Sequence, residues 1–136
     1  MKSKKIILFL LFLILIILII TAVFFNKKNN KTILTYSLNK KQYKLLIADT
    51  PEKWEKGLMF FRKLDQGVDG MIFLFPDKQY RSFWNKNTYM DLDLYWFNDE
   101  KVVGKSFLPS IEKSKEIVVV NSSKPVNKVI ELPAGH

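Results

Sequence analysis

The segment LDLYWFNDEKVVGKSF, residues 92–107, decides the fold class, because it has the pattern of two β-strands joined by a tight turn. Leucine, aromatic and aspartate side chains alternate over residues 92–96, as in a strand with one buried face. The polar triplet Asn-Asp-Glu at 98–100 separates this run from a second β-rich run over 101–107, which predicts a hairpin. The sequence therefore favours a domain built mainly from antiparallel β-strands.

Similar short runs lie on both sides of this hairpin, at residues 32–38, 42–48, 71–75, 80–84, 117–120 and 126–132. One short helix is expected after Thr50, which can cap it, with Pro51 at its first helical position. Gly57 is expected either to end this helix or to allow a close backbone approach. Pro76 and Asp77 are expected to begin a turn. Together these elements predict a mainly β (α+β) fold, a compact antiparallel sheet curled into a small barrel or sandwich.

The N-terminal segment differs sharply from this domain. Residues 6–25 carry no charge, and a helix of this length would reach roughly 30 Å, the thickness of a bilayer core. The run is longer than a signal-peptide core, so the sequence favours a retained transmembrane anchor over a cleaved signal. Because Lys2, Lys4 and Lys5 precede it, we expect a single-pass protein with a cytoplasmic N-terminus and an extracytoplasmic C-terminal domain.

The expected organisation is an anchor or signal over residues 1–25, a polar linker over 26–31 and one globular β-rich domain over 32–136. Residues 1–31 carry six lysines and no acid, which suits contact with anionic membrane lipid. The remaining 105 residues carry sixteen basic and thirteen acidic side chains, a net charge of +3, so nucleic acid is not an expected partner. Cysteine is absent, and no metal or other cofactor is expected.

Two carboxylates and one loop carry the most chemical interest. Asp91 and Asp93 would share one strand face, where they could bind a cation, act as acid and base, lie in solvent, or hold the preceding loop by accepting its N–H groups. The loop over residues 82–88 combines aromatic, amide and lysine side chains, which suits a ligand surface, although it could equally be a turn that bonds its own backbone. We expect Asp93 to organise this loop so that Lys86 and Asn87 face a ligand.

Five motifs and one proline occur in a characteristic order: GLMFFR (57–62), GMIFLF (70–75), SFWNKNT (82–88), LDLYWF (92–97), Pro109 and ELPAG (131–135). In this order they resemble the bacterial and archaeal family called domain of unknown function 192, over about residues 43–135. The resemblance implies a compact β-rich domain, often exported or membrane-anchored, and no established activity. It also implies signature positions at Gly57, Gly70, Trp84, Lys86, Asn87, Thr88, Asp93 and Glu131.

The chain departs from the family pattern at two relevant positions. The family usually has methionine after the tryptophan, whereas this chain has Asn85. The family arginine usually comes four residues after the first glycine, but here that residue is Phe61 and the arginine is Arg62. One helical residue corresponds to a rotation of about 100°, so Arg62 is expected to point elsewhere unless the loop absorbs the shift.

The leading functional hypothesis is a membrane-tethered, non-catalytic module that binds a small polar ligand or an envelope protein. Its ligand-binding residues would be Trp84, Lys86, Asn87, Thr88, Asp93 and Glu131.

The alternative is an envelope glycan hydrolase that uses Asp91 or Asp93 with Glu131 as acid and base. That chemistry requires two carboxylates about 5–9.5 Å apart across a cleft, so carboxylates on opposite faces of a sheet would argue against it. A third hypothesis, a purely structural anchor, predicts no pocket near Trp84.

Overall fold

The computed structural model describes residues 2–27 and 32–135, and the chain forms two units, Met1–Lys31 and Thr32–His136. The first unit contains the helix α1 (Lys2–Lys27). Within the part of the chain that the structure describes, no helix is both long enough and apolar enough to cross a membrane. The transmembrane helix expected over residues 6–25 therefore stays a prediction from the sequence. The predicted linker 26–31 starts within α1, and residues 28–31 lie outside the described residues, as does His136.

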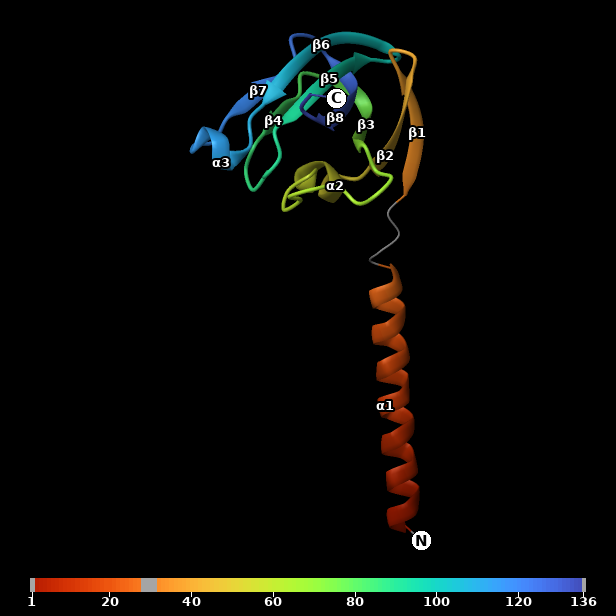
Figure 1. The fold of residues 1–136 in the computed structure, drawn as a ribbon. Coiled ribbons are helices and arrows are strands. Elements are labelled where there is room, and N and C mark those ends of the chain that lie inside the picture. The colour runs from red at the N-terminus through yellow and green to blue at the C-terminus, as the bar shows by residue number, and fades with distance from the viewer. Residues whose placement is uncertain (1, 28–31, 136) are drawn as a thin grey trace. The chain divides into compact units, whose positions relative to one another are not determined.

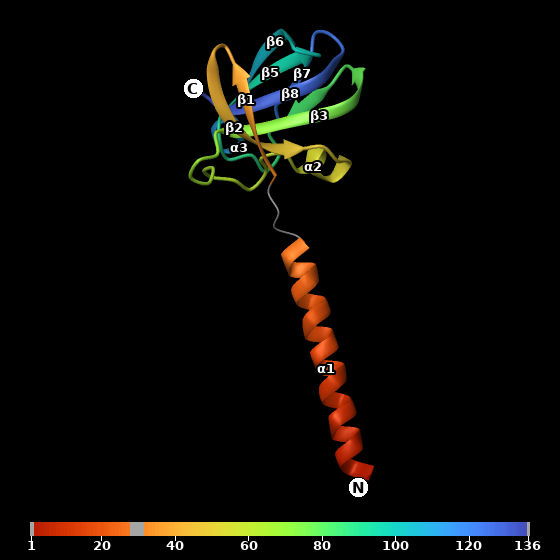
Figure 2. The same ribbon diagram turned by 90° about the vertical axis from the view of Figure 1, so that its right-hand side faces the viewer.

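The second unit is a β-rich domain with two sheets and two short helices, and Figures 1 and 2 show how they are arranged. The larger sheet has the strand order β1 (Ile33–Leu38), β2 (Lys41–Ala48), β3 (Gly70–Gln79), β8 (Val126–Pro133), β5 (Leu92–Asn98) and β6 (Lys101–Leu108). The smaller sheet pairs β4 (Ser82–Trp84) with β7 (Val119–Asn121), and the helices are α2 (Pro51–Lys56) and α3 (Ile111–Ser114).

The main sheet is mixed and open, which corrects two details of the predicted fold. Strands β2 and β3 are parallel, because the chain passes through α2 between them and re-enters the sheet in the same direction. The other neighbouring strands are antiparallel. In the described domain β1 and β6 are the edges of the sheet, so the predicted barrel is not closed. The sheet is instead strongly curved, with α2 below it in both views (Figures 1 and 2).

The predicted hairpin is present as β5 and β6, and it builds the centre of the core. Leu94 and Trp96 lie in one cluster of buried side chains, whereas Phe97 lies in a second cluster on the other face. A bulge at Trp96 places Gly104 opposite the indole, where a Cβ atom would lie 3.3 Å from the ring. Both faces of the curved sheet are therefore covered, and side chains from either face of a central strand are buried.

The helix α2 forms where the sequence predicts it. The Thr50 side chain accepts the Lys53 N–H, Pro51 occupies the first turn, and the helix ends at Gly57 with φ +47°. The Trp54 indole N–H donates to the carbonyl oxygens of Ala48 and Leu74, at 3.0 and 3.1 Å, which fixes α2 against β2 and β3.

Two local predictions were wrong or incomplete. The expected turn at Pro76 and Asp77 is part of β3, which continues to Gln79. The register of β3 against β8 is irregular between Leu74 and Gln79, and such an irregularity accommodates a proline that cannot donate to the ladder. The short helix α3, capped by Ser110, was not predicted.

Candidate functional site

A cavity of about 380 Å³ opens between α2 with the turn after it, the strand β3 and the segment 80–84. Glu131 from β8 and Thr88 from the following loop complete its lining. We call it the Glu131 cavity. Its size lies within the range of small-molecule sites, and most of its wall is aromatic or aliphatic.

Glu131 is buried because β8 lies in the middle of the main sheet. Its cross-strand neighbours are Met71 on β3 and Leu94 on β5, so apolar side chains flank it on both sides. The residue is 4 % exposed, and its Oε2 atom is buried without a hydrogen-bond partner in the structure. Burial alone raises the pKa of Glu131 to about 8, since removal from water penalises the charged form. The carboxyl is therefore largely protonated at neutral pH.

Two glycines let other parts of the chain come close to this residue. A Cβ atom at Gly57 would lie 3.8 Å from Glu131 Oε2 and 3.3 Å from the Phe73 ring. A Cβ atom at Gly70 would lie 2.1 Å from the Glu131 carbonyl oxygen, which no side chain could tolerate. The expectation of a close approach at Gly57 is thus confirmed, and Gly57 and Gly70, which begin two of the sequence motifs, both pack around Glu131.

Aromatic rings form the wall beside the carboxyl. Phe73 packs edge-on against Phe83 with ring centroids 4.8 Å apart, and the ring centroids of Trp54 and Phe75 are 5.1 Å apart. Trp84, at the rim, is 43 % exposed. Such rings offer polarisable faces to a ligand and keep water from the carboxyl.

Arg81 lies in the same wall with its guanidinium 4.0 Å above the Phe75 ring. Its Nη2 group forms an ion pair with Asp77 at 2.5 Å, whereas its Nε atom is buried without a partner. Arg81 Nε and Glu131 Oε2 are the buried side-chain polar atoms without a partner in the described residues, and both residues line one cavity. Unsatisfied buried polar atoms are rare in folded proteins, so their coincidence marks this cavity as the candidate site.

The loop 84–88 is organised by Asn85, not by Asp93 as predicted. Asn85 is fully buried; its amide nitrogen donates to the Pro109 carbonyl and the Ser114 hydroxyl, and its side-chain oxygen accepts the Val118 N–H at 2.8 Å. The residue that departs from the family pattern is thus the structural centre of the loop. The Thr88 N–H donates to the Asn85 carbonyl, which closes the turn.

The structure separates the six predicted ligand-binding residues into three groups. Trp84, Thr88 and Glu131 line the Glu131 cavity. Lys86 and Asn87 line an adjoining groove of about 280 Å³, which shares Trp84 with the cavity. Lys86 is exposed, with its ammonium 4.9 Å from the Trp84 ring. Asp93 lines neither space.

Asp93 lies on the opposite face of the sheet from Glu131. Leu94 is the cross-strand partner of Glu131 and Leu132 is that of Asp93, and neighbouring residues of a strand alternate between its faces. The Asp93 carboxylate pairs with Lys105 at 3.0 Å and accepts no N–H from the loop in the structure. The predicted unit of Asp93 and loop 84–88 was therefore wrong.

Asp91 is also committed to a structural role. It accepts the Ser110 N–H and pairs with Lys113, both at 2.8 Å, and these contacts lower its pKa. It thereby fixes the start of α3. Arg62, the displaced arginine, pairs with Glu112 at 2.9 Å and does not line the Glu131 cavity.

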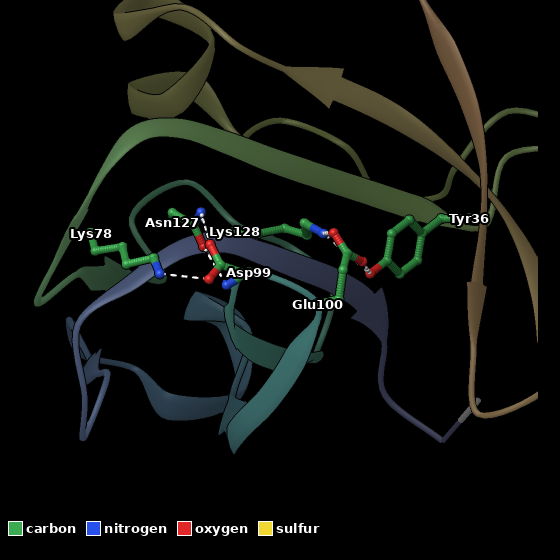
Figure 3. Close-up of polar contacts among 6 residues, drawn as sticks. All are labelled: Tyr36, Lys78, Asp99, Glu100, Asn127 and Lys128. Carbon is green, nitrogen blue, oxygen red and sulfur yellow. Dashed lines mark hydrogen bonds and ion pairs between the residues drawn. The ribbon is translucent and has the colours of Figure 1, made fainter.

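A second polar cluster surrounds Lys128 (Figure 3), whose side chain lies on the other face of β8 from Glu131 because the two residues are three positions apart along the strand. Lys128 is nearly buried, lies over the Tyr36 and Phe97 rings, and pairs with Glu100, which also accepts the Tyr36 hydroxyl. Beside it, Asp99 accepts from both Lys78 and Asn127 (Figure 3). Since each of these residues has a partner within the cluster, the cluster is explained by the fold. No group of three potential metal ligands occurs among the described residues.

Sequence reasoning missed Arg81 and the depth at which Glu131 is buried. A signal for Arg81 exists, since it is one of only two arginines in the sequence and lies between aromatic residues. Glu131 lies between Ile130 and Leu132, and that alternation is compatible with an exposed face. Only the covering of both sheet faces makes it buried.

Comparison with known proteins agrees with this architecture. A crystal structure of a protein from Sinorhizobium meliloti, described as a candidate transcription regulator, is 29 % identical, with a TM-score of 0.61 over 76 % of this chain and 78 % of that one. A protein of unknown function from Novosphingobium aromaticivorans is 24 % identical, with a TM-score of 0.63 over 77 % of this chain and 74 % of that one, which supports the fold alone. No curated protein was found to match. The model of the family DUF192, described as "Uncharacterized ACR", matches residues 33–136, and the chain therefore belongs to this family.

Proposed function

We propose that the domain is a non-catalytic module that binds a small polar ligand in the Glu131 cavity. The observation that carries the proposal is that two buried, unpartnered polar atoms, Glu131 Oε2 and Arg81 Nε, belong to residues that line one cavity. Leaving such a group without a partner costs about 1–3 kcal/mol, and a ligand that bonds to both atoms recovers this energy. The adjoining groove, with Lys86 and Asn87 at its rim, provides a second contact region for a longer ligand.

The geometry argues against the glycan hydrolase alternative. Asp93 and Glu131 lie on opposite faces of the sheet, so they cannot flank one glycosidic bond. The Asp91 carboxylate is occupied by Ser110 and Lys113. Neither Asp91 nor Asp93 can therefore act as the second carboxylate beside Glu131, and binding is favoured over hydrolysis.

The location remains a proposal from the sequence. We propose that residues 1–25 direct the domain to an extracytoplasmic position at a membrane, because a basic start precedes a long uncharged segment. The proposal requires the full chain to stay with the membrane fraction during an alkaline carbonate wash. Release of the full-length chain by that wash would contradict a retained anchor.

A panel of small polyols, amines and carboxylates tests the binding function. Nuclear magnetic resonance spectra of the full chain should show that at least one class perturbs the Gly57 amide and the Trp54 indole signals. Trp84→Ala should weaken that binding, whereas Phe107→Ala is a matched control, because Phe107 is similarly exposed and does not line the cavity. If no class perturbs these signals, or if both variants behave alike, the cavity is not a binding site.

A further inference from the structure

We propose that the ligand of the Glu131 cavity carries a cationic nitrogen, as in an organic amine, which pairs with Glu131 while an oxygen of the same molecule accepts from Arg81. This inference rests on the proposed function and names its ligand class. It follows from three features of the cavity: an isolated carboxyl, walls of aromatic rings and an unpaired donor.

The first feature is the electrostatic isolation of Glu131. Burial accounts for its raised pKa, and its Oε2 atom has no hydrogen-bond partner among the described residues. The positive charge of Arg81 is already engaged by Asp77 and by the Phe75 ring. An incoming cation would therefore supply the counter-charge that the protein does not provide, and attraction between charges is strong where water is excluded.

The second feature is the ring wall. The negative face of an aromatic ring attracts a cation by about 0.5–2 kcal/mol, more when the pair is shielded from water. Two rings that line the cavity already carry a cation of the chain, because Arg81 lies over Phe75 and Lys86 lies over Trp84. Phe83 belongs to the same wall, is only partly buried, and carries no cation among the described contacts.

The third feature is the donor at Arg81. Its buried Nε–H needs an acceptor, and a cationic nitrogen cannot provide one. A hydroxyl or carbonyl oxygen on the same ligand would satisfy it. An amino alcohol is therefore the simplest molecule that complements both unpartnered atoms.

The proposal predicts in which direction ligand binding changes with pH. A cation pairs with the ionised form of Glu131, so binding releases a proton and tightens as the pH rises towards the pKa of the carboxyl. A neutral polyol gains nothing from this ionisation, and an anion binds better to the protonated form. Glu55 and Lys56 from α2, and Tyr80 and Arg81 from the segment before β4, are the other titratable groups that line the cavity.

Three probes of matched length test the proposal: 4-amino-1-butanol, 1,4-butanediol and 4-hydroxybutyrate. Each is titrated into the full chain at pH 6, 7 and 8 while the Gly57 amide and Trp54 indole signals are followed. We expect the dissociation constant of the amino alcohol to fall about tenfold from pH 6 to pH 7 and about fivefold from pH 7 to pH 8, because the ionised fraction of Glu131 rises by these factors as the pH approaches its pKa. The diol should show no such trend.

Glu131→Gln should abolish the pH trend while Glu55, Lys56, Tyr80 and Arg81 remain in place. Asp93→Asn is the matched control, because it removes a carboxylate on the other face and should leave the trend intact. Equal binding of the amino alcohol and the diol, or amino-alcohol binding that weakens from pH 6 to 8, would overturn the proposal. Binding of the diol or the hydroxy acid alone would do so too, yet it would leave the cavity as a binding site.

Discussion

Replacing Glu131 by glutamine should change how the stability of the protein depends on pH. The pKa of Glu131 is about 8 in the folded chain, against an ordinary value of 4.5. An acid whose pKa is raised by folding contributes no penalty below its unfolded pKa, and it destabilises the fold progressively as the pH rises towards the folded pKa. The parent protein should therefore lose stability between about pH 4.5 and pH 8.

The expected size follows from linkage. Each pH unit within this window corresponds to about 1.4 kcal/mol for one group, so the parent should lose about 2–3 kcal/mol between pH 6 and pH 8. Carboxyls with lowered pKa, such as Asp91 and Glu100, affect stability only at lower pH. The raised pKa of Tyr36 acts only at higher pH. The interval from pH 6 to pH 8 therefore isolates Glu131.

Urea unfolding of the full chain, followed by tryptophan fluorescence at several pH values, measures this dependence. Glu131→Gln carries no ionisable group at this position, so its free energy of unfolding should stay level from pH 6 to pH 8. The variant should match the parent below about pH 4, and it should be about 2 kcal/mol more stable than the parent at pH 6 and about 4 kcal/mol more stable at pH 8. A parent protein with a level profile, or a variant with the same slope as the parent, would show that Glu131 is not buried as an isolated acid.

Three further substitutions test the other assignments, each by the free energy of unfolding at pH 7. Asn85→Ala should lower the free energy of unfolding by about 2–4 kcal/mol, because it leaves several buried donors and acceptors without a partner. Lys86→Ala, at the exposed neighbouring residue, should change it by no more than about 0.5 kcal/mol. Equal effects of the two substitutions would contradict the role of Asn85. Asp93→Asn should cost less than about 1 kcal/mol, since it loses one ion pair with a half-exposed lysine, and a larger loss would point to an unrecognised role in the loop. Gly57→Ala should cost about 1–2 kcal/mol, because alanine is strained at φ +47° and its Cβ would crowd Phe73; a neutral result would show that the turn can relax.

The parts of the fold that could be predicted depend on local sequence. The β5–β6 hairpin needs only an alternating run, a polar turn and a second run, and it was predicted correctly. The cap at Thr50 and the helix end at Gly57 are local in the same way. The parallel pairing of β2 with β3 joins residues separated by α2 and a loop, and no short pattern encodes it.

The candidate site was predicted only in part for the same reason. Trp84 and Thr88 were found because the loop is unusual in composition. Asn85 was read as a departure from a family pattern, but its role depends on Pro109 and Val118, far away in the chain. The face on which Asp93 or Glu131 lies follows from strand register, which the sequence left open.

The contrast between Asp93 and Glu131 is the strongest argument that the cavity serves a ligand. Both carboxyls lie on adjacent central strands and both are nearly buried. The fold gives Asp93 a counter-charge in Lys105, on the neighbouring strand. It gives Glu131 none, although a charge buried without a partner destabilises the fold at any pH where it ionises. A glutamine or an apolar side chain would avoid that penalty, so a carboxyl at this position is best explained by a partner that arrives from outside the chain.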